Sequence, residues 1–152
     1  MRTRLVTLIA LFCAMQFAAD YHLSPRFRTV YIVPMTNSLN EHLASRLTSS
    51  RVLWVVLEPS NADSVLTEAV DEGFWSWLDR TYPAPAGGNR GTANGGAYSP
   101  SVKNAGTVFL VDPRNRVVLW SMYCLPKNST PAELDRTASR ITSQLKTAFA
   151  KN

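Results

Sequence analysis

Apolar residues along the chain gather in short runs that predict strands. The runs at residues 29–35 and 51–59 are rich in β-branched and aromatic residues, as is typical of buried strands, and Pro34 and Pro59 close them. A third run at residues 62–70 also predicts a strand, although its alanine and glutamate content leaves a helix open as an alternative.

Other segments show the longer period of amphipathic helices. Leu39, Leu43 and Leu47 recur every four residues behind Ser38 and Glu41, whose spacing is that of a capping box. A second helix is predicted over residues 71–82, weakened by Gly73, with one apolar side made of Phe74, Trp77, Leu78 and Tyr82. A third begins with a cap at Thr130, Pro131 and Glu133 and carries an apolar stripe of Leu134, Ala138, Ile141, Leu145 and Phe149.

The stretch FLVDPRNRVVLW, residues 109–120, predicts an antiparallel hairpin. Asp112 is expected to accept hydrogen bonds from backbone groups of the turn, and Pro113 sets φ at the next position. Asn115 is expected to take the left-handed conformation that closes the loop. Apolar strands flank the turn on both sides.

The resulting order, β-α-β-β-(α)-β-β-α, predicts an α/β domain of the two-layer α+β kind, with a mixed β-sheet and helices packed on one face. Strict alternation divides the hairpin into two apolar faces. One carries Leu110, Val117, Leu119 and Tyr123, and the other carries Phe109, Val111, Val118, Trp120 and Met122. The second face therefore needs a cover, supplied either by the segment with Trp75 and Trp77 or by another protein.

The N-terminus predicts a signal peptide at residues 1–19, followed by a single domain at 20–152. Arg2 and Arg4 precede fifteen uncharged residues that end at Ala18 and Ala19. The run is shorter than the ~20 residues that span a bilayer, so a permanent anchor is the weaker alternative. Lipidation at Cys13 is disfavoured because the bulky Phe12 precedes it. A periplasmic or secreted location and no stable membrane span in the mature form follow as expectations.

Charge and composition narrow the classes of partner. Two of the 16 basic residues lie in the predicted signal peptide and none of the 11 acidic residues does, so much of the net charge of +5 belongs to targeting. The remaining basic residues form no block, which argues against nucleic acid as a partner. Five of the seven glycines lie between residues 87 and 96, within a stretch at 83–104 that predicts a disordered insertion without phosphate-loop spacing.

Candidate chemistry is sparse, and no catalytic residue or cofactor is predicted. The two histidines are His22 and His42, and His42 is interpreted as a structural residue of the first helix. Cys124 is interpreted as a buried, inert thiol. Cleavage after Ala19 would expose Asp20-Tyr21-His22, in which the amine, two amides and the imidazole could bind Cu(II) or Ni(II), so Asp20 and His22 form the one candidate metal site.

The order of several short sequence motifs resembles that of a known family. "ADSVLT" followed by "VFLVDPRNRVVLWS", together with "VYIVPMTNSLNEHLASRLTSS", resembles the periplasmic fold shared by CsgG, the N-terminal domain of TolB and LpoB-type activators. The chain is also similar to uncharacterised secreted proteins of soil bacteria that carry the same phrases around a low-complexity insertion. The resemblance covers roughly residues 28–83 and 105–150, and it implies a nonenzymatic envelope domain that acts through protein contacts. The chain lacks a matching lipidation cysteine, which puts membrane anchoring and pore assembly in doubt.

The sequence therefore predicts a protein-binding or assembly module of the cell envelope, with an envelope protein or a second copy as partner. Trp54, Trp120 and Met122, on the second sheet face, are the predicted interaction surface. The alternative is a carrier of a small apolar ligand or lipid, with a pocket between the sheet and the helix of residues 75–82.

Overall fold

A computed structural model describes residues 26–83 and 106–150. The predicted signal peptide and nearly all of the predicted insertion lie outside these ranges. The elements are, in chain order, β1 (Thr29–Ile32), the 3₁₀ turn η1 (Thr36–Ser38), α1 (Leu39–Ser50), β2 (Trp54–Val55), the 3₁₀ turn η2 (Pro59–Asn61), β3 (Ser64–Thr67), α2 (Glu72–Thr81), β4 (Thr107–Asp112), β5 (Val117–Tyr123) and α3 (Pro131–Ala150).

The strands form one mixed sheet, as the sequence predicted, and their order in it is β2-β1-β3-β4-β5. β1 is parallel to both β2 and β3, whereas β4 is antiparallel to both of its neighbours, β3 and β5. The run at 62–70 therefore contains a strand rather than a helix, Ser64–Thr67, and these four residues are all buried. The second predicted strand is much shorter than expected, because only Trp54 and Val55 pair with β1. β2 and β5 are the two edges of the sheet.

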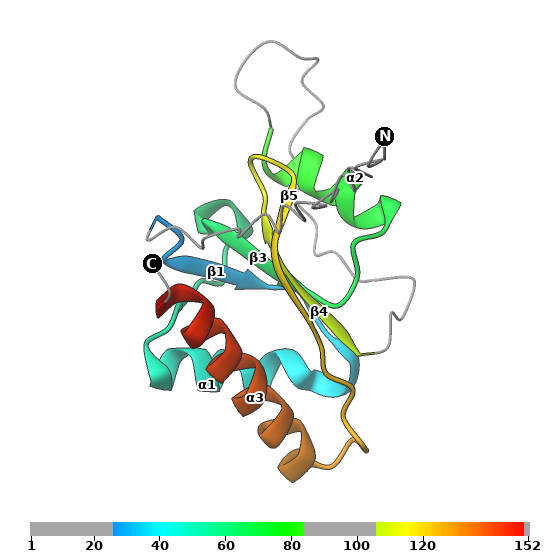
Figure 1. The fold of residues 1–152 in the computed structure, drawn as a ribbon. Coiled ribbons are helices and arrows are strands. Elements are labelled where there is room, and N and C mark those ends of the chain that lie inside the picture. The colour runs from blue at the N-terminus through cyan, green and yellow to red at the C-terminus, as the bar shows by residue number, and fades with distance from the viewer. Residues whose placement is uncertain (1–25, 84–105, 151–152) are drawn as a thin grey trace, which may run out of the picture.

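Helices cover both faces of the sheet, which corrects the expectation of a single helical face. α1 and α3 lie together on one face and α2 lies on the other (Figure 1). The first face encloses the larger core, which includes Val30, Leu43, Leu66, Leu110 and Ile141. The second encloses a smaller aromatic core of Val33, Val65, Phe74, Trp77, Leu78, Tyr82 and Val111. The segment around Trp77 is thus the cover that the two apolar faces required.

α2 forms where the sequence predicted it, because its first turn is capped and its apolar residues share a face. The Asp71 side chain accepts a hydrogen bond from the Phe74 N–H at 2.7 Å, which satisfies a backbone donor of the first turn. Phe74, Trp77 and Leu78 are buried against the sheet, and Trp77 is only 1% exposed. Burial of these large side chains stabilises the helix far more than Gly73 weakens it.

A β-bulge in β5 overturns the predicted faces of the hairpin. Leu110 pairs with Trp120 but Val111 pairs with Val118, so Leu119 is an extra residue. The bulge turns Trp120 and Met122 toward the larger core, on the side of α1 and α3. Strict alternation had placed both residues with Val118, which packs against the aromatic core instead.

Two local predictions were also wrong in detail. Ser38 makes no side-chain cap and instead adopts a left-handed backbone, with φ of 61°. In the hairpin turn, Asp112 accepts hydrogen bonds from the N–H groups of Arg114 and Asn115, as predicted. The left-handed residue, however, is Arg116, with φ of 58°, and not Asn115.

Asp63 fastens the start of β1 to the start of β3. Its Oδ2 accepts hydrogen bonds from the N–H groups of Arg28 and Thr29 and from the Thr29 hydroxyl, the last at 2.9 Å. Burial alone would raise the pKa of Asp63, but these hydrogen bonds outweigh it and hold the pKa below its usual value. Asp63 therefore joins the two strands through backbone donors that are 35 and 34 residues away in the chain.

Candidate functional site

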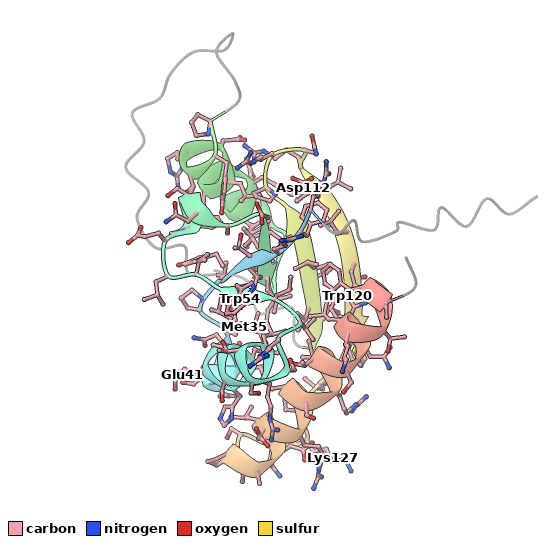
Figure 2. All side chains as sticks on the ribbon, turned by 90° about the vertical axis from the view of Figure 1, so that its left-hand side faces the viewer. Met35, Glu41, Trp54, Asp112, Trp120 and Lys127 are labelled. Carbon is pink, nitrogen blue, oxygen red and sulfur yellow. The ribbon has the colours of Figure 1, made fainter. Side chains whose placement is uncertain are left out.

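The three predicted contact residues do not form one surface. Trp54 lies on the edge strand β2 and is 64% exposed, whereas Trp120 and Met122 lie on β5, at the opposite edge (Figure 2). Both β5 side chains are partly buried against the larger core. The second sheet face, which was predicted to need a cover from the Trp75 and Trp77 segment or from another protein, lies under α2.

The residues that the sequence analysis considered for metal binding or thiol reactivity contribute little to a site. Asp20 and His22 lie outside the described residues. Within residues 26–83 and 106–150, no group of three or more His, Cys, Asp or Glu side chains could hold a metal ion. Cys124 is buried, as predicted, and desolvation raises the pKa of its thiol. Across these same ranges, no helix has the length and apolar character needed to cross a bilayer.

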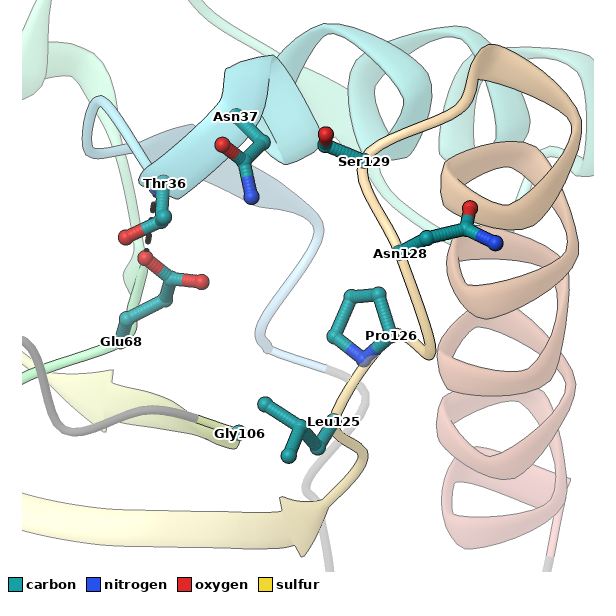
Figure 3. Close-up of a pocket in the computed structure, with 8 residues that line it drawn as sticks. All are labelled: Thr36, Asn37, Glu68, Gly106, Leu125, Pro126, Asn128 and Ser129. Atoms are coloured by element: carbon teal, nitrogen blue, oxygen red, sulfur yellow. Dashed lines mark hydrogen bonds between the residues drawn. The ribbon is translucent and has the colours of Figure 1, made fainter.

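A cavity of about 210 Å³ lies at the carboxyl ends of β1 and β3 (Figure 3). This is the end of a parallel strand pair at which α/β proteins commonly bind ligands. Its lining comes from segments far apart in the chain. Thr36 and Asn37 come from η1, Glu68 follows β3, Gly106 precedes β4, and Leu125, Pro126, Asn128 and Ser129 follow β5.

Glu68 is the charged residue among those that line this cavity. Its Oε2 accepts a hydrogen bond from the Thr36 N–H at 2.7 Å, which ties the end of β3 to η1. The other carboxylate oxygen turns toward the middle of the cavity, facing the side formed by Pro126 and Leu125 (Figure 3). The side opposite Glu68 thus combines the apolar Leu125 and Pro126 with the polar Asn128 and Ser129 of the same segment.

The backbone beside the cavity is held in an uncommon conformation. Asn37 and Ser38 are consecutive left-handed residues, with φ of 57° and 61°, and neither is glycine. Such residues cost free energy and persist where the surroundings hold them. Here two hydrogen bonds hold the preceding segment. The Glu68 carboxylate accepts one from the Thr36 N–H, and the Asn40 side chain accepts the other from the Met35 N–H at 3.2 Å.

The edge strand β5 ends beside this cavity. Cys124 N–H donates to the Gly106 carbonyl, so alternation along the ladder directs the backbone groups of Met122 toward β4 and those of Ser121 and Tyr123 outward. The outer side of β5 pairs with no strand in the part of the chain that the structure describes. Residues 117–125 contain no charged residue and no proline, which are the usual protections of an open edge.

Exposed apolar side chains connect the edge to the cavity. Tyr123 is 68% exposed and Leu125 is 51% exposed. Gly106 makes this arrangement possible, because its φ is +98° and an added Cβ would lie 2.9 Å from the Leu125 Cβ. The edge of β5, Tyr123, Leu125 and the cavity therefore form one continuous candidate site, which we call the β5-edge site.

Sequence reasoning named Trp120 and Met122 of β5, whose side chains turn toward the larger core, and it missed the cavity. The charge-free run at 117–125 was a visible signal for an unprotected strand, but its position at an edge depends on the strand order. Glu68 and Asn37 carried no signal, because only the fold brings them to Leu125.

Comparisons with known proteins identify no relative. No protein-family model matches the sequence, and neither the curated proteins nor the solved structures contain a significant match.

Proposed function

We propose that the protein is a nonenzymatic binding module of the cell envelope that takes up an extended segment of another protein along the β5-edge site. The observation that carries this proposal is the outer edge of β5, where the backbone groups of Ser121 and Tyr123 pair with no strand among the described residues and no charge lies nearby in the sequence to repel a partner. Addition of a strand to such an edge is a recurrent mode of peptide recognition.

The bulge supports a docking segment of limited length. It separates Val117 and Val118 from the regular part of β5 that begins at Trp120. A strand added to β5 would therefore pair chiefly at Ser121 and Tyr123 and continue past Leu125. Main-chain hydrogen bonds would supply affinity, and the side chains at the end of the strand would supply specificity.

The envelope location and the resemblance to the CsgG, TolB and LpoB-type fold are part of the same proposal. They are supported by the N-terminal pattern of the sequence and by the order of its phrases. The alternative of a lipid or small-ligand carrier has less support. The cavity of about 210 Å³ is smaller than the roughly 300–1,000 Å³ of pockets that enclose a drug-sized ligand.

The test uses a displayed library of random nine-residue peptides, selected on the purified protein. Binders are then measured by fluorescence anisotropy against wild type, Ser121→Pro and Ser121→Ala. Proline at 121 removes an outward N–H and leaves the ladder to β4 intact, whereas alanine changes only the exposed side chain.

We expect Ser121→Pro to weaken binding roughly tenfold or more, as the loss of a backbone pairing position predicts, and Ser121→Ala to leave it unchanged. Thermal unfolding of both variants checks that the fold is kept. Peptides that bind wild type and Ser121→Pro equally would overturn the edge proposal. A concentration-dependent dimer in light scattering, lost in Ser121→Pro, would instead identify a second copy as the partner.

A further inference from the structure

We infer that the cavity at the end of β5 receives a basic side chain of the bound segment, with Glu68 as its counter-charge. This inference rests on the proposed binding of an extended segment to β5. It adds the chemical class of residue that the segment must carry at the position next to Leu125.

The size of the cavity fits one side chain rather than a whole ligand. Its volume of about 210 Å³ lies below the range of small-molecule pockets, and it opens beside the end of an edge strand. A segment paired with β5 at Ser121 and Tyr123 that continues past Leu125 would pass residues that line the cavity. The cavity is thus placed to accept a side chain from a chain that is already held by its backbone.

The chemistry of the walls selects a side chain with an apolar stem and a cationic head. Leu125 and Pro126 form the apolar part of one side, where Asn128 and Ser129 also line the cavity, and the Glu68 carboxylate lies across from them (Figure 3). Lysine and arginine have this composition, since each carries a hydrocarbon stem behind its charge. An apolar side chain would leave the carboxylate without a partner, and an acidic one would be repelled.

Glu68 is available for such a contact. Its Oε2 accepts from the Thr36 N–H, and no described residue donates to its second oxygen or forms an ion pair with it. A carboxylate can accept several hydrogen bonds, so a cation can bind without breaking the bond to Thr36. The amide of Thr36 consequently reports directly on any change in the charge at Glu68.

The experiment is a ¹⁵N–¹H NMR titration of the protein with three capped amino acids, which carry a lysine, an arginine or a norleucine side chain. Norleucine keeps the stem and lacks the charge. Wild type is compared with Glu68→Gln, which keeps an oxygen acceptor for the Thr36 N–H. Glu72→Gln, an equal change of charge at the exposed start of α2 on the other side of the sheet, is the matched control.

The lysine or the arginine probe, or both, should shift the amides of Thr36, Gly106 and Leu125 saturably, and norleucine should not. Glu68→Gln should weaken this binding roughly tenfold, as loss of a charge-assisted hydrogen bond predicts, and Glu72→Gln should not. Leu125→Ala offers a second variant, because this half-exposed side chain can be shortened without opening the core, and it too should weaken binding.

Equal shifts with norleucine, or lysine and arginine binding that survives Glu68→Gln, would overturn the inference. The peptide selection separates this result from a failure of the proposed function. Peptides whose binding is weakened by Ser121→Pro but which show no preference for a basic residue would leave the edge proposal standing. They would remove only the role of Glu68. If Ser121→Pro does not weaken peptide binding and the peptides show no preference for a basic residue, both the edge proposal and the role of Glu68 are removed.

Discussion

Arg116 closes the β4–β5 turn with its backbone and clamps it with its side chain, so its replacement tests two effects together. The guanidinium donates to Asp79 Oδ1 from Nε at 3.0 Å and from Nη2 at 2.6 Å, and also to the carbonyls of Tyr82 and Pro113. The backbone meanwhile occupies the left-handed region, with φ of 58°. We predict that Arg116→Ala destabilises the protein more than Arg116→Gly does.

The magnitudes follow from exposure and conformation. Asp79 is 70% exposed, so its ion pair contributes at most about 1 kcal/mol, and the two carbonyl hydrogen bonds contribute about 1 kcal/mol together once their partial exposure is allowed for. Arg116→Ala should therefore lower the free energy of unfolding by about 2 kcal/mol. Arg116→Gly loses the same contacts but relieves about 1 kcal/mol of left-handed backbone cost, which leaves a loss of about 1 kcal/mol.

Calorimetry and urea unfolding measure this difference, which corresponds to roughly 4 °C in Tm between the two variants. Asn115→Ala and Asn115→Gly are the control pair, because Asn115 is not among the left-handed residues. Glycine should be the better replacement at 116 and the worse one at 115. An alanine variant at 116 as stable as the glycine variant would refute the assignment of the left-handed position.

Three further predictions concern other parts of the fold. Asp63→Asn should destabilise the protein at neutral pH, and the difference from wild type in urea unfolding should shrink as pH falls. The lowered pKa of Asp63 makes its contribution full above the unfolded value of about 4 and lost as pH falls through the lower folded pKa. In a thiol titration, folded wild type and folded Cys124→Ala should show the same number of reactive thiols. Wild type should show one more than the variant after unfolding, because burial both shields Cys124 and raises its pKa. Gly106→Ala should cost roughly 2 kcal/mol in urea unfolding and shift the Leu125 amide in NMR, since its Cβ would crowd Leu125 at a positive φ.

The sequence predicted the order of elements because each element carries a local period. Leu39, Leu43 and Leu47 fill the larger core as their spacing indicated, and Phe74, Trp77 and Leu78 fill the aromatic core. Asp112 identified the turn because its carboxylate bonds within the next three residues. These signals are readable because the interactions behind them lie within one element or one turn.

Features that depend on pairing between distant segments could not be predicted. The extra residue Leu119 has no local signature, so alternation assigned Trp120 and Met122 to the wrong face. Arg116 rather than Asn115 is left-handed, and its guanidinium bonds to Asp79 of α2 and to the Tyr82 carbonyl, which are distant in the chain. The cavity likewise depends on long-range contacts, because Glu68 meets η1 only through the pairing of β3 with β1.

The bulge at Leu119 also bears on solubility. A flat, uncharged seven-residue edge strand is a template on which further copies can stack in fibrils. The extra residue twists β5 and keeps its regular open stretch short. Deletion of Leu119 would straighten the ladder while leaving Trp120 opposite Leu110, so we expect the shortened protein to fold but to aggregate at lower concentration, as turbidity and thioflavin T fluorescence would show. The bulge would thus limit the stacking of further copies on β5 and leave only the short stretch at Ser121 and Tyr123 for a partner.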